Sequence, residues 1–170
     1  MIDIIAGAKG KGKTKILIQQ VNDDIKLTKG TIVYLDKNNK HMYELSNQIR
    51  LIVVPEFNVT DTDMFLGFIA GIISQDHDLD KIYLDSFLKV AKLEDKDITG
   101  TLGQLDEIGK QFNVTFVISV SLDKEEIPEA LHGKYAGICT EIRFSRIIIR
   151  CYLIQNRPVI YIHGGYLEFE

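Results

Sequence analysis

The sequence is poor in cysteine, which excludes a disulfide framework. Cys139 and Cys151 are its two cysteines in 170 residues; both lie in apolar, strand-like surroundings, and neither belongs to a C-x-x-C pair. Small secreted domains held by disulfides carry several spaced cysteines, whereas reduced core cysteines are typical of cytoplasmic proteins. We therefore expect both residues to be reduced and the protein to be cytoplasmic.

The chain also lacks long hydrophobic runs, an excess of positive charge and internal repeats. No segment approaches the roughly 20 apolar residues that a membrane-spanning helix needs. Met1 leads directly into a strand-like segment, so we expect no signal segment. The net charge of −4 and the pI near 5.6 argue against a protein whose main work is to coat nucleic acid. With 45% hydrophobic residues, residues 1–170 are expected to form a single domain.

A glycine-rich segment near the N-terminus is the most informative feature that is present. Residues 7–14 fit the pattern G-x-x-x-x-G-K-S/T and follow the apolar run 2–6; they are Gly7, Ala8, Lys9, Gly10, Lys11, Gly12, Lys13 and Thr14. A strand that delivers such a loop into a helix lets backbone N–H groups converge on a polyphosphate, at a helix N-terminus whose dipole favours anions. The segment therefore predicts a binding loop for a nucleoside triphosphate such as ATP.

Each residue type in this loop has a separate role in holding the triphosphate. Gly7, Gly10 and Gly12 allow positive φ angles and a close backbone approach that a Cβ would obstruct. Lys13 can reach the β- and γ-phosphates, where it also acts in catalysis, and the Thr14 hydroxyl is placed to ligate Mg²⁺.

Strand and helix patterns alternate along the chain, which favours an α/β fold with a parallel sheet. Helices are expected over 13–25, from Asp61 or Thr62 through 73, from Thr99 or Thr101 to 111, and around 124–131. Strands are expected over 2–6, 31–36, 49–54, 81–85 and 114–120, and residues 75–80 are expected to form a solvated acidic turn. From 137 onward the chain reads as strand, strand, a turn at 155–158, and strand.

An acidic residue ends the apolar strand 82–85. A carboxylate at the carboxyl end of a strand beside the glycine-rich loop can hold Mg²⁺ through water. Asp85 is therefore the predicted acidic residue of the Mg²⁺ site, together with Thr14. A helix cap is the alternative role for Asp85. Asp36, at the end of the strand 31–36, competes for the metal role but ranks lower, because other P-loop proteins use this second strand end for substrate or catalytic groups.

The order of these motifs resembles the RecA-like ATPases over nearly the whole chain. The resemblance rests on the loop, the second strand with its polar end, "IYLDS", "FNVTFVISVS" and the final "IIIRCYLIQNRPVIYIHGGYLEF". Residues 1–130 also resemble a group of small bacterial P-loop proteins, some of which carry a pilus-retraction label. The resemblance implies a mainly parallel sheet flanked by helices, a C-terminal antiparallel hairpin, and the 114–120 strand between the loop strand and the Asp85 strand. It also implies that Ser119 or Ser121 lies near the γ-phosphate.

Two departures from the RecA-like pattern bear on catalysis. The family commonly places a water-orienting glutamate just past the second strand, where this chain has Asp36, Lys37 and Asn38. Either Asp36 serves as the acid, or Asn38 occupies the position and hydrolysis is slow. The family's hairpin often presents a Lys-x-Arg pair across a subunit boundary, where its positive charge stabilises the transition state. In this chain only Arg157 remains as a candidate for such an arginine finger, which would act between the subunits of a homo-oligomer. Arg157 fits an ordinary turn residue equally well.

Three functions from different classes remain open at this point. The first is a slow RecA-like ATPase whose nucleotide state controls assembly or the binding of a protein partner. The second is a P-loop kinase with Asp36 as the base towards a substrate hydroxyl, although no arginine-rich lid lies between Asp85 and Val114. The third is a nucleotide-dependent interaction module without hydrolysis. A dinucleotide-binding site is excluded, because Lys15 stands where its third glycine is required.

Overall fold

The computed structural model describes residues 1–122 with their side chains, and the backbone of the segments 135–138, 140–144, 147–154, 157–162 and 165–168. The helix expected around 124–131, and Cys139, lie outside these ranges.

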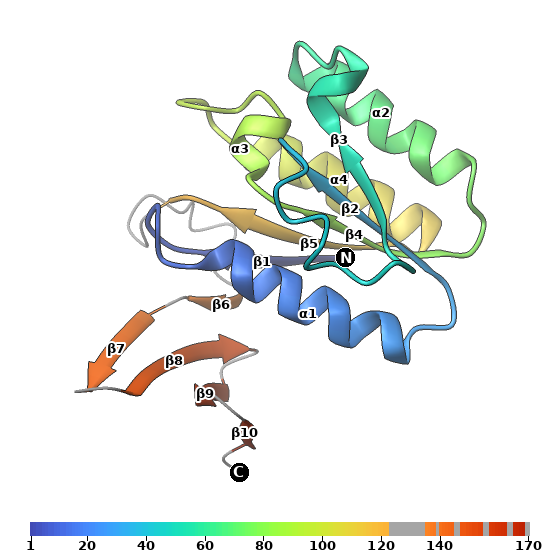
Figure 1. The fold of residues 1–170 in the computed structure, drawn as a ribbon. Helices are drawn as coiled ribbons and strands as arrows, with labels where there is room; N and C mark the ends of the chain where they lie inside the picture. The colour runs from blue at the N-terminus through green and yellow to red at the C-terminus, as the bar shows by residue number, and fades with distance from the viewer. Residues whose placement is uncertain (123–134, 139, 145–146, 155–156, 163–164, 169–170) are drawn as a thin grey trace.

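A parallel sheet forms the centre of the fold (Figure 1). Its strands are β1 (Ile2–Ala6), β2 (Thr31–Asp36), β3 (Arg50–Val53), β4 (Leu79–Leu84), β5 (Thr115–Val120) and β6 (Tyr135–Ile138). They lie in the order β3-β2-β4-β5-β1-β6, and every neighbouring pair is parallel. Strand β5 therefore separates β1 from β4, as the RecA-like resemblance implied. This order places the carboxyl ends of β1, β2, β4 and β5 at one edge of the sheet.

Helices cover both faces of this sheet (Figure 1). Helix α1 (Lys13–Leu27) packs on one face, where its Leu17, Ile18 and Val21 lie in one apolar cluster with residues of β1, β2, β4 and β5. Helices α2 (Thr62–Ser74), α3 (Phe87–Val90) and α4 (Thr99–Phe112) contribute to the larger apolar cluster on the other face. Successive side chains of a strand point to opposite faces of the sheet. Polar side chains on the α1 face therefore lie on the same side of the sheet as the glycine-rich loop, which leads into α1.

The ends of the elements follow from local chemistry. The Asp61 carboxylate accepts a hydrogen bond of 2.8 Å from the Met64 amide and caps α2, as expected. Strand β3 ends at Val53 rather than at residue 54, because Pro55 lies in the first turn of the 3₁₀ helix η1 (Val54–Phe57), where its fixed φ is tolerated. Strand β4 begins at Leu79, two residues before the predicted start.

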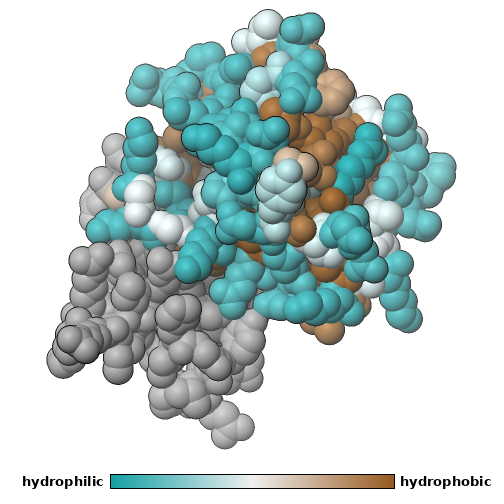
Figure 2. Space-filling view, viewed as in Figure 1, coloured by the Kyte–Doolittle hydropathy of each residue, from teal (hydrophilic) through white to brown (hydrophobic). Residues whose placement is uncertain are grey.

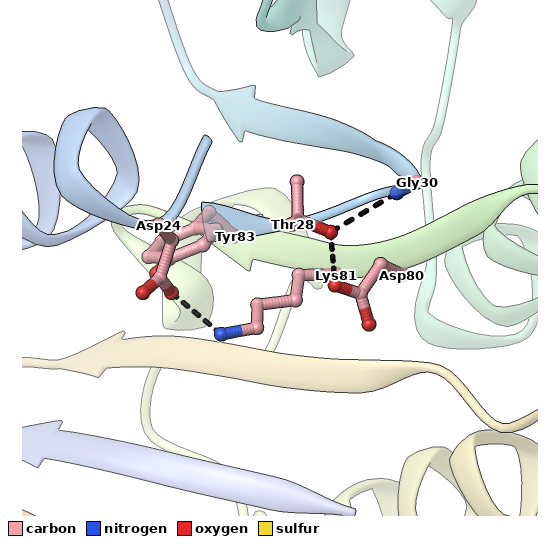
Figure 3. Close-up of polar contacts among 6 residues, drawn as sticks. All are labelled: Asp24, Thr28, Gly30, Asp80, Lys81 and Tyr83. Atoms are coloured by element: carbon pink, nitrogen blue, oxygen red, sulfur yellow. Dashed lines mark hydrogen bonds and ion pairs between the residues drawn. The ribbon is translucent and has the colours of Figure 1, made fainter. Parts of the chain in front are cut away.

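Polar contacts tie α1 and the start of β2 to β4 at the other edge of the sheet (Figure 3). Lys81 Nζ lies 2.7 Å from Asp24 Oδ2, and the Thr28 hydroxyl donates to Asp80. Thr31 donates to Asp76 in the same region. The acidic segment 75–80 is therefore not the fully solvated turn that the sequence predicted, because its carboxylates accept hydrogen bonds from the neighbouring strand and the loop before it.

A second, antiparallel sheet follows β6. It consists of β7 (Thr140–Phe144), β8 (Ile147–Ile154), β9 (Arg157–Ile162) and β10 (Gly165–Glu168), in the order β10-β9-β8-β7. The expected C-terminal hairpin is confirmed as the antiparallel pair β8 and β9, in which Arg157 opposes Ile154. Residues 155 and 156, which form the predicted turn, lie outside the described ranges.

Hydrophilic residues cover much of the described surface in the view of Figure 2, and hydrophobic residues show between them on the side of β3 and α2. Large exposed hydrophobic residues of this region include Phe57 and Met64. Helices with the length and apolar character for crossing a membrane do not occur in the described part of the chain.

Candidate functional site

The glycine-rich loop joins the end of β1 to the start of α1. Gly7, Gly10 and Gly12 have φ angles of 152°, 85° and 82°, in the positive region that side chains with a Cβ rarely adopt. Gly12 is the N-cap of α1, where no side chain caps the free backbone N–H groups, and the first turn carries no acidic residue. An anion at this position would meet unsatisfied donors and the positive end of the helix dipole.

Lys13 is held over this loop. Its side chain is buried, with 7% of the residue exposed. The ammonium donates to the Gly7 carbonyl at 2.5 Å and to the Ala8 carbonyl at 2.9 Å. Burying an ammonium group is costly unless it has partners, and the loop carbonyls supply them here. The Lys13 ammonium, which is the expected phosphate-binding cation, thus lies against the loop. A bound phosphate could replace the two loop carbonyls as its hydrogen-bond acceptor.

Asp85 follows β4 directly and is 3% exposed. Its Oδ1 accepts hydrogen bonds from the Ser119 hydroxyl at 2.6 Å and from the Ser86 amide at 2.7 Å. Ser86 adopts a left-handed backbone conformation with φ of 53°, which turns the chain sharply after the acid. One carboxylate oxygen is therefore fixed by two donors.

Asp36 ends β2 and lies on the neighbouring strand. The Asp85 amide donates to the Leu35 carbonyl at 2.9 Å, so the two acids occupy equivalent positions at adjacent strand ends. Asp36 is 2% exposed and accepts from the Lys37 amide at 2.6 Å. Burial, and next the negative charge of Asp85, raise the pKa of the Asp36 carboxyl above its ordinary value. The two carboxylates form a buried acidic pair beside the loop.

Lys37 and Asn38 follow this pair in the loop after β2. The Lys37 ammonium donates to the Ser86 hydroxyl at 3.0 Å, which links the ends of β2 and β4. Asn38 is half-buried, and its side-chain carbonyl accepts from the Lys40 amide at 3.0 Å. This bond is typical of an asparagine that stabilises a turn. The structure therefore gives Asn38 a local backbone partner.

Buried polar residues are concentrated at this edge. Six polar or charged residues are buried in the described part of the chain: Lys13, Asp36, Asp85, Thr101, Asp106 and Ser119. Four of the six lie at the glycine-rich loop or at the carboxyl ends of β2, β4 and β5. Charged and hydrogen-bonding groups are seldom buried together without a use, and such clusters are typical of functional sites.

Sequence reasoning did not find Tyr34, which lies beneath these acids. Tyr34 is 0% exposed. Burial, followed by the charges of Asp85 and Asp36 and a hydrogen bond to Asp85, raises the pKa of this phenol. A tyrosine in an apolar strand looks like a core residue, and only the pairing of β2 with β4 shows which groups surround its hydroxyl.

The predicted site residues thus divide into two groups. The structure brings Gly7 to Thr14, Asp36, Asn38, Asp85 and Ser119 to one edge of the parallel sheet. Ser121, the alternative to Ser119, is an exposed residue just after β5. Arg157 lies in the second sheet, at the start of β9.

The residues at this edge fit ATP and Mg²⁺ chemically. The loop offers positive-φ glycines and a helix N-terminus to phosphates, and Gly10 has open space where a Cβ would stand. The hydroxyl of Thr14 and the carboxylate of Asp85 are oxygen ligands of the type that Mg²⁺ prefers.

Comparison with known proteins supports the fold. No family model matches the chain, and no curated protein matches its sequence. Among solved structures, it is similar to the flagellar accessory protein FlaH from Methanocaldococcus jannaschii, with a TM-score of 0.64 and 10% sequence identity over 99% of this chain and 89% of that one. Together with the strand order, this likeness confirms the expected RecA-like α/β fold, and at this identity it speaks for the fold alone.

Proposed function

We propose that this protein binds ATP with Mg²⁺ at the glycine-rich loop and hydrolyses it slowly, and that its nucleotide state controls assembly or the binding of a protein partner. The observation that carries the proposal is the group of buried polar residues around that loop: Lys13, Asp36, Asp85 and Ser119. A RecA-like fold is consistent with nucleotide binding in general. The specific assignment rests on the site and not on the fold.

In this proposal the loop residues bind and orient the triphosphate. The backbone N–H groups of residues 8–14 and the Lys13 ammonium would contact its phosphates. Lys13 would exchange its bonds to Gly7 and Ala8 for phosphate oxygens, which costs little because one set of acceptors replaces another. Thr14 and Asp85 would hold Mg²⁺, which when bound neutralises the charge on the phosphate oxygens. Ser119 and the Ser86 amide would fix the orientation of Asp85.

We assign the role of the acid that positions the attacking water to Asp36. It lies at the strand end next to Asp85, whereas Asn38 has its carbonyl engaged by the Lys40 amide. A carboxylate can accept a proton from the water, and an amide cannot. The same position suits a kinase, in which Asp36 would accept the proton of a substrate hydroxyl. Arg157 remains the candidate finger for a neighbouring subunit of a homo-oligomer.

The first experiment measures nucleotide binding by isothermal titration calorimetry. The wild-type protein is expected to bind MgATP, and Lys13→Ala to lose this binding while keeping its far-UV circular dichroism spectrum. Lys15→Ala is the matched control, because Lys15 is an exposed lysine in the same first turn of α1. If Lys13→Ala binds MgATP as tightly as the wild type, the glycine-rich loop is not the nucleotide site.

The second experiment separates the three functions by following phosphate release over a series of protein concentrations. Turnover per subunit that rises with concentration, and that falls in Arg157→Ala, supports an ATPase with a finger supplied by a neighbour. Transfer of labelled phosphate to an added hydroxyl acceptor supports the kinase. Binding without release or transfer at any concentration supports the non-hydrolysing interaction module.

A further inference from the structure

The loop after β2 begins with a lysine whose side chain reaches the end of the neighbouring strand β4. Lys37 is exposed, and its ammonium donates to the Ser86 hydroxyl at 3.0 Å. The Ser86 amide in turn donates to Asp85 Oδ1 at 2.7 Å and to the Ser119 hydroxyl at 2.9 Å. A mobile positive charge thus lies against the residue that directly follows Asp85, the acid that we assign to the Mg²⁺ site.

The backbone that carries Lys37 is held in place on both sides. The Lys37 amide donates to Asp36 Oδ1 at 2.6 Å, directly after β2. Further along the loop, the Asn22 side chain of α1 donates to the Glu44 carbonyl at 2.7 Å and accepts from the Ser46 amide at 2.8 Å. The Lys37 ammonium can therefore change its partner by rotation of an exposed side chain alone, which is a fast and inexpensive motion.

The present partner of this ammonium is a neutral hydroxyl, although two buried acids lie close by. Burial and the charge of Asp85 raise the pKa of Asp36, and the Lys37 amide and the positive charge of Lys37 oppose them. The Lys37 charge therefore acts at the strand ends where the acids lie. An anionic oxygen within reach of this ammonium would attract it more strongly than the Ser86 hydroxyl does, because a Coulomb attraction between opposite charges is added.

Lys37 and Lys13 approach the site from opposite sides. In the strand order, β4 and β5 lie between β2, which Lys37 follows, and β1, whose loop leads to Lys13. The buried carboxylates of Asp36 and Asp85 make the edge between them negative. A polyphosphate beside these acids needs positive charge close to it. Lys37 supplies this charge on the side of the site that lies away from the glycine-rich loop.

We propose that Lys37 distinguishes ATP from ADP: its ammonium leaves the Ser86 hydroxyl to bind the γ-phosphate of ATP, and it stays on Ser86 when ADP is bound. The inference rests on the proposed function, in which a water held by Asp36 attacks the γ-phosphate. That phosphate then faces the strand end that Lys37 follows. The Lys37 bond to Ser86, which links the ends of β2 and β4, is therefore expected with ADP and lost with ATP, so that the two nucleotide states differ in the structure of the protein.

The first test compares two affinities by calorimetry with Mg²⁺, for ADP and for the β,γ-imido analogue of ATP, which is not hydrolysed. Lys37→Ala is expected to bind the analogue about tenfold more weakly, because a charged hydrogen bond is lost, and to bind ADP as the wild type does. Lys37→Arg keeps the positive charge and is expected to lose less. Lys40→Ala is the matched control, because Lys40 is an exposed lysine of the same loop.

A second variant separates this role from that of a structural link between the strands. Ser86→Ala removes the present partner of Lys37 but leaves the ammonium in place. It is expected to keep the wild-type ratio of the two affinities or to increase it, because Lys37 then gives up no hydrogen bond when it binds the γ-phosphate. A structural link would instead make Ser86→Ala and Lys37→Ala equivalent.

A chemical readout follows Lys37 in the wild-type protein without any substitution. Lysines are acetylated, and the extent of reaction at each one is measured by mass spectrometry. An ammonium bound to a phosphate reacts slowly because it stays protonated and covered. With Mg²⁺ present, Lys37 is expected to react several times more slowly with the ATP analogue bound than with ADP bound. Lys40 is expected to react equally in both states.

The outcomes separate this inference from the proposed function. If the wild type binds neither nucleotide, the proposed function fails and the role of Lys37 fails with it. If both nucleotides bind but Lys37→Ala keeps the wild-type ratio of affinities, or if Lys37 reacts equally in both states, the role of Lys37 is overturned and the proposed nucleotide site stands. An equal loss of this ratio in Ser86→Ala also overturns it, because Lys37 would then act through Ser86.

Discussion

The Ser119 hydroxyl on β5 lies 2.6 Å from Asp85 Oδ1 at the end of β4 and donates a hydrogen bond to it. The two residues are 34 positions apart in the chain and meet because β4 and β5 are neighbours in the sheet. Both are buried. A hydrogen bond to a buried carboxylate fixes its orientation, which is a property that a metal ligand needs.

The first prediction concerns Asp85. We expect Asp85→Asn to weaken ATP binding in the presence of Mg²⁺ at least about tenfold, since a charged metal partner is lost, and to leave binding in EDTA unchanged. Calorimetry with and without Mg²⁺ measures both. Asp106→Asn is the matched control, because Asp106 is another buried aspartate but pairs with Lys110 at 2.9 Å on α4. Equal losses under both conditions would make Asp85 a structural residue.

The second prediction uses two glycines of the same helix, α4. A Cβ on Gly109 would lie 2.6 Å from the Met1 nitrogen and 2.7 Å from the Val114 carbonyl oxygen, whereas a Cβ on Gly103 would meet nothing within 4 Å. Gly109→Ala should therefore destabilise the fold by about 1–3 kcal/mol through overpacking. Gly103→Ala should stabilise it by about 0.5–1 kcal/mol through helix propensity.

Urea denaturation of both alanine variants measures this difference. If the two free energies of unfolding change in the same direction, Gly109 is not packed closely against Met1 and Val114. The pair thus tests the packing that aligns α4 with β1 and β5.

Much of this architecture could be predicted from the sequence because local signals determine it. The glycine-rich loop, the Asp61 cap and the unbroken apolar strand that became β5 each carry their signal within a few neighbouring residues. The predicted ends of these elements were wrong by only a few residues, for example by two at the start of β4. Strand β4 begins at Leu79 because it pairs with Thr31 of β2, and no local pattern shows that pairing.

The interior of the site could not be predicted in the same way. The approach of the Tyr34 hydroxyl to Asp85, the Lys37 bond to Ser86 and the bond of Tyr83 to Asp24 all join residues that are far apart in the chain. Each depends on which strands are neighbours and on their register. An apolar strand with a tyrosine predicts burial, but the partner of its hydroxyl is set by tertiary structure.

The third prediction concerns pH and Asp3 of β1. Burial raises the pKa of this half-buried carboxyl above its ordinary value of 3.8, against the opposing effect of Lys81, and Asp24 raises it further. Because the pKa of Asp3 is higher in the folded state than in the unfolded chain, protonation of Asp3 stabilises the fold. This stabilisation is fully present below pH 3.8 and is lost as the pH rises through the folded pKa. At pH 7 the ionised Asp3 is therefore destabilising.

Asp3→Asn is consequently expected to raise the melting temperature at pH 7, with a gain in stability below about 1 kcal/mol because solvent screens a half-buried charge. The gain should shrink as the pH falls towards 3, where the wild-type carboxyl is protonated. Thermal melts from pH 3 to 8 measure it. A gain that is constant over this range would assign the effect to packing, and a loss at pH 7 would mean that the Lys81 charge outweighs burial.

The last prediction decides between the two residues that follow β2. Asp36 is buried at the strand end next to Asp85, whereas Asn38 is half-buried and held in a turn by the Lys40 amide. If Asp36 positions the attacking water, Asp36→Asn should lower phosphate release at least about 10²-fold while MgATP still binds. Asn38→Glu should leave the release nearly unchanged, and wild-type turnover should lie well below the typical enzyme value of about 10 s⁻¹.

Single-turnover phosphate release, with MgATP affinity from calorimetry, measures both variants. A rise in Asn38→Glu with little effect of Asp36→Asn would move the water-orienting position two residues along the chain, and the slow wild type would then follow from an amide where other enzymes have a carboxylate. Wild-type protein that binds MgATP but releases no phosphate at any concentration would leave neither residue a catalytic role. In that case the buried acidic pair serves only to hold the metal and the nucleotide in place.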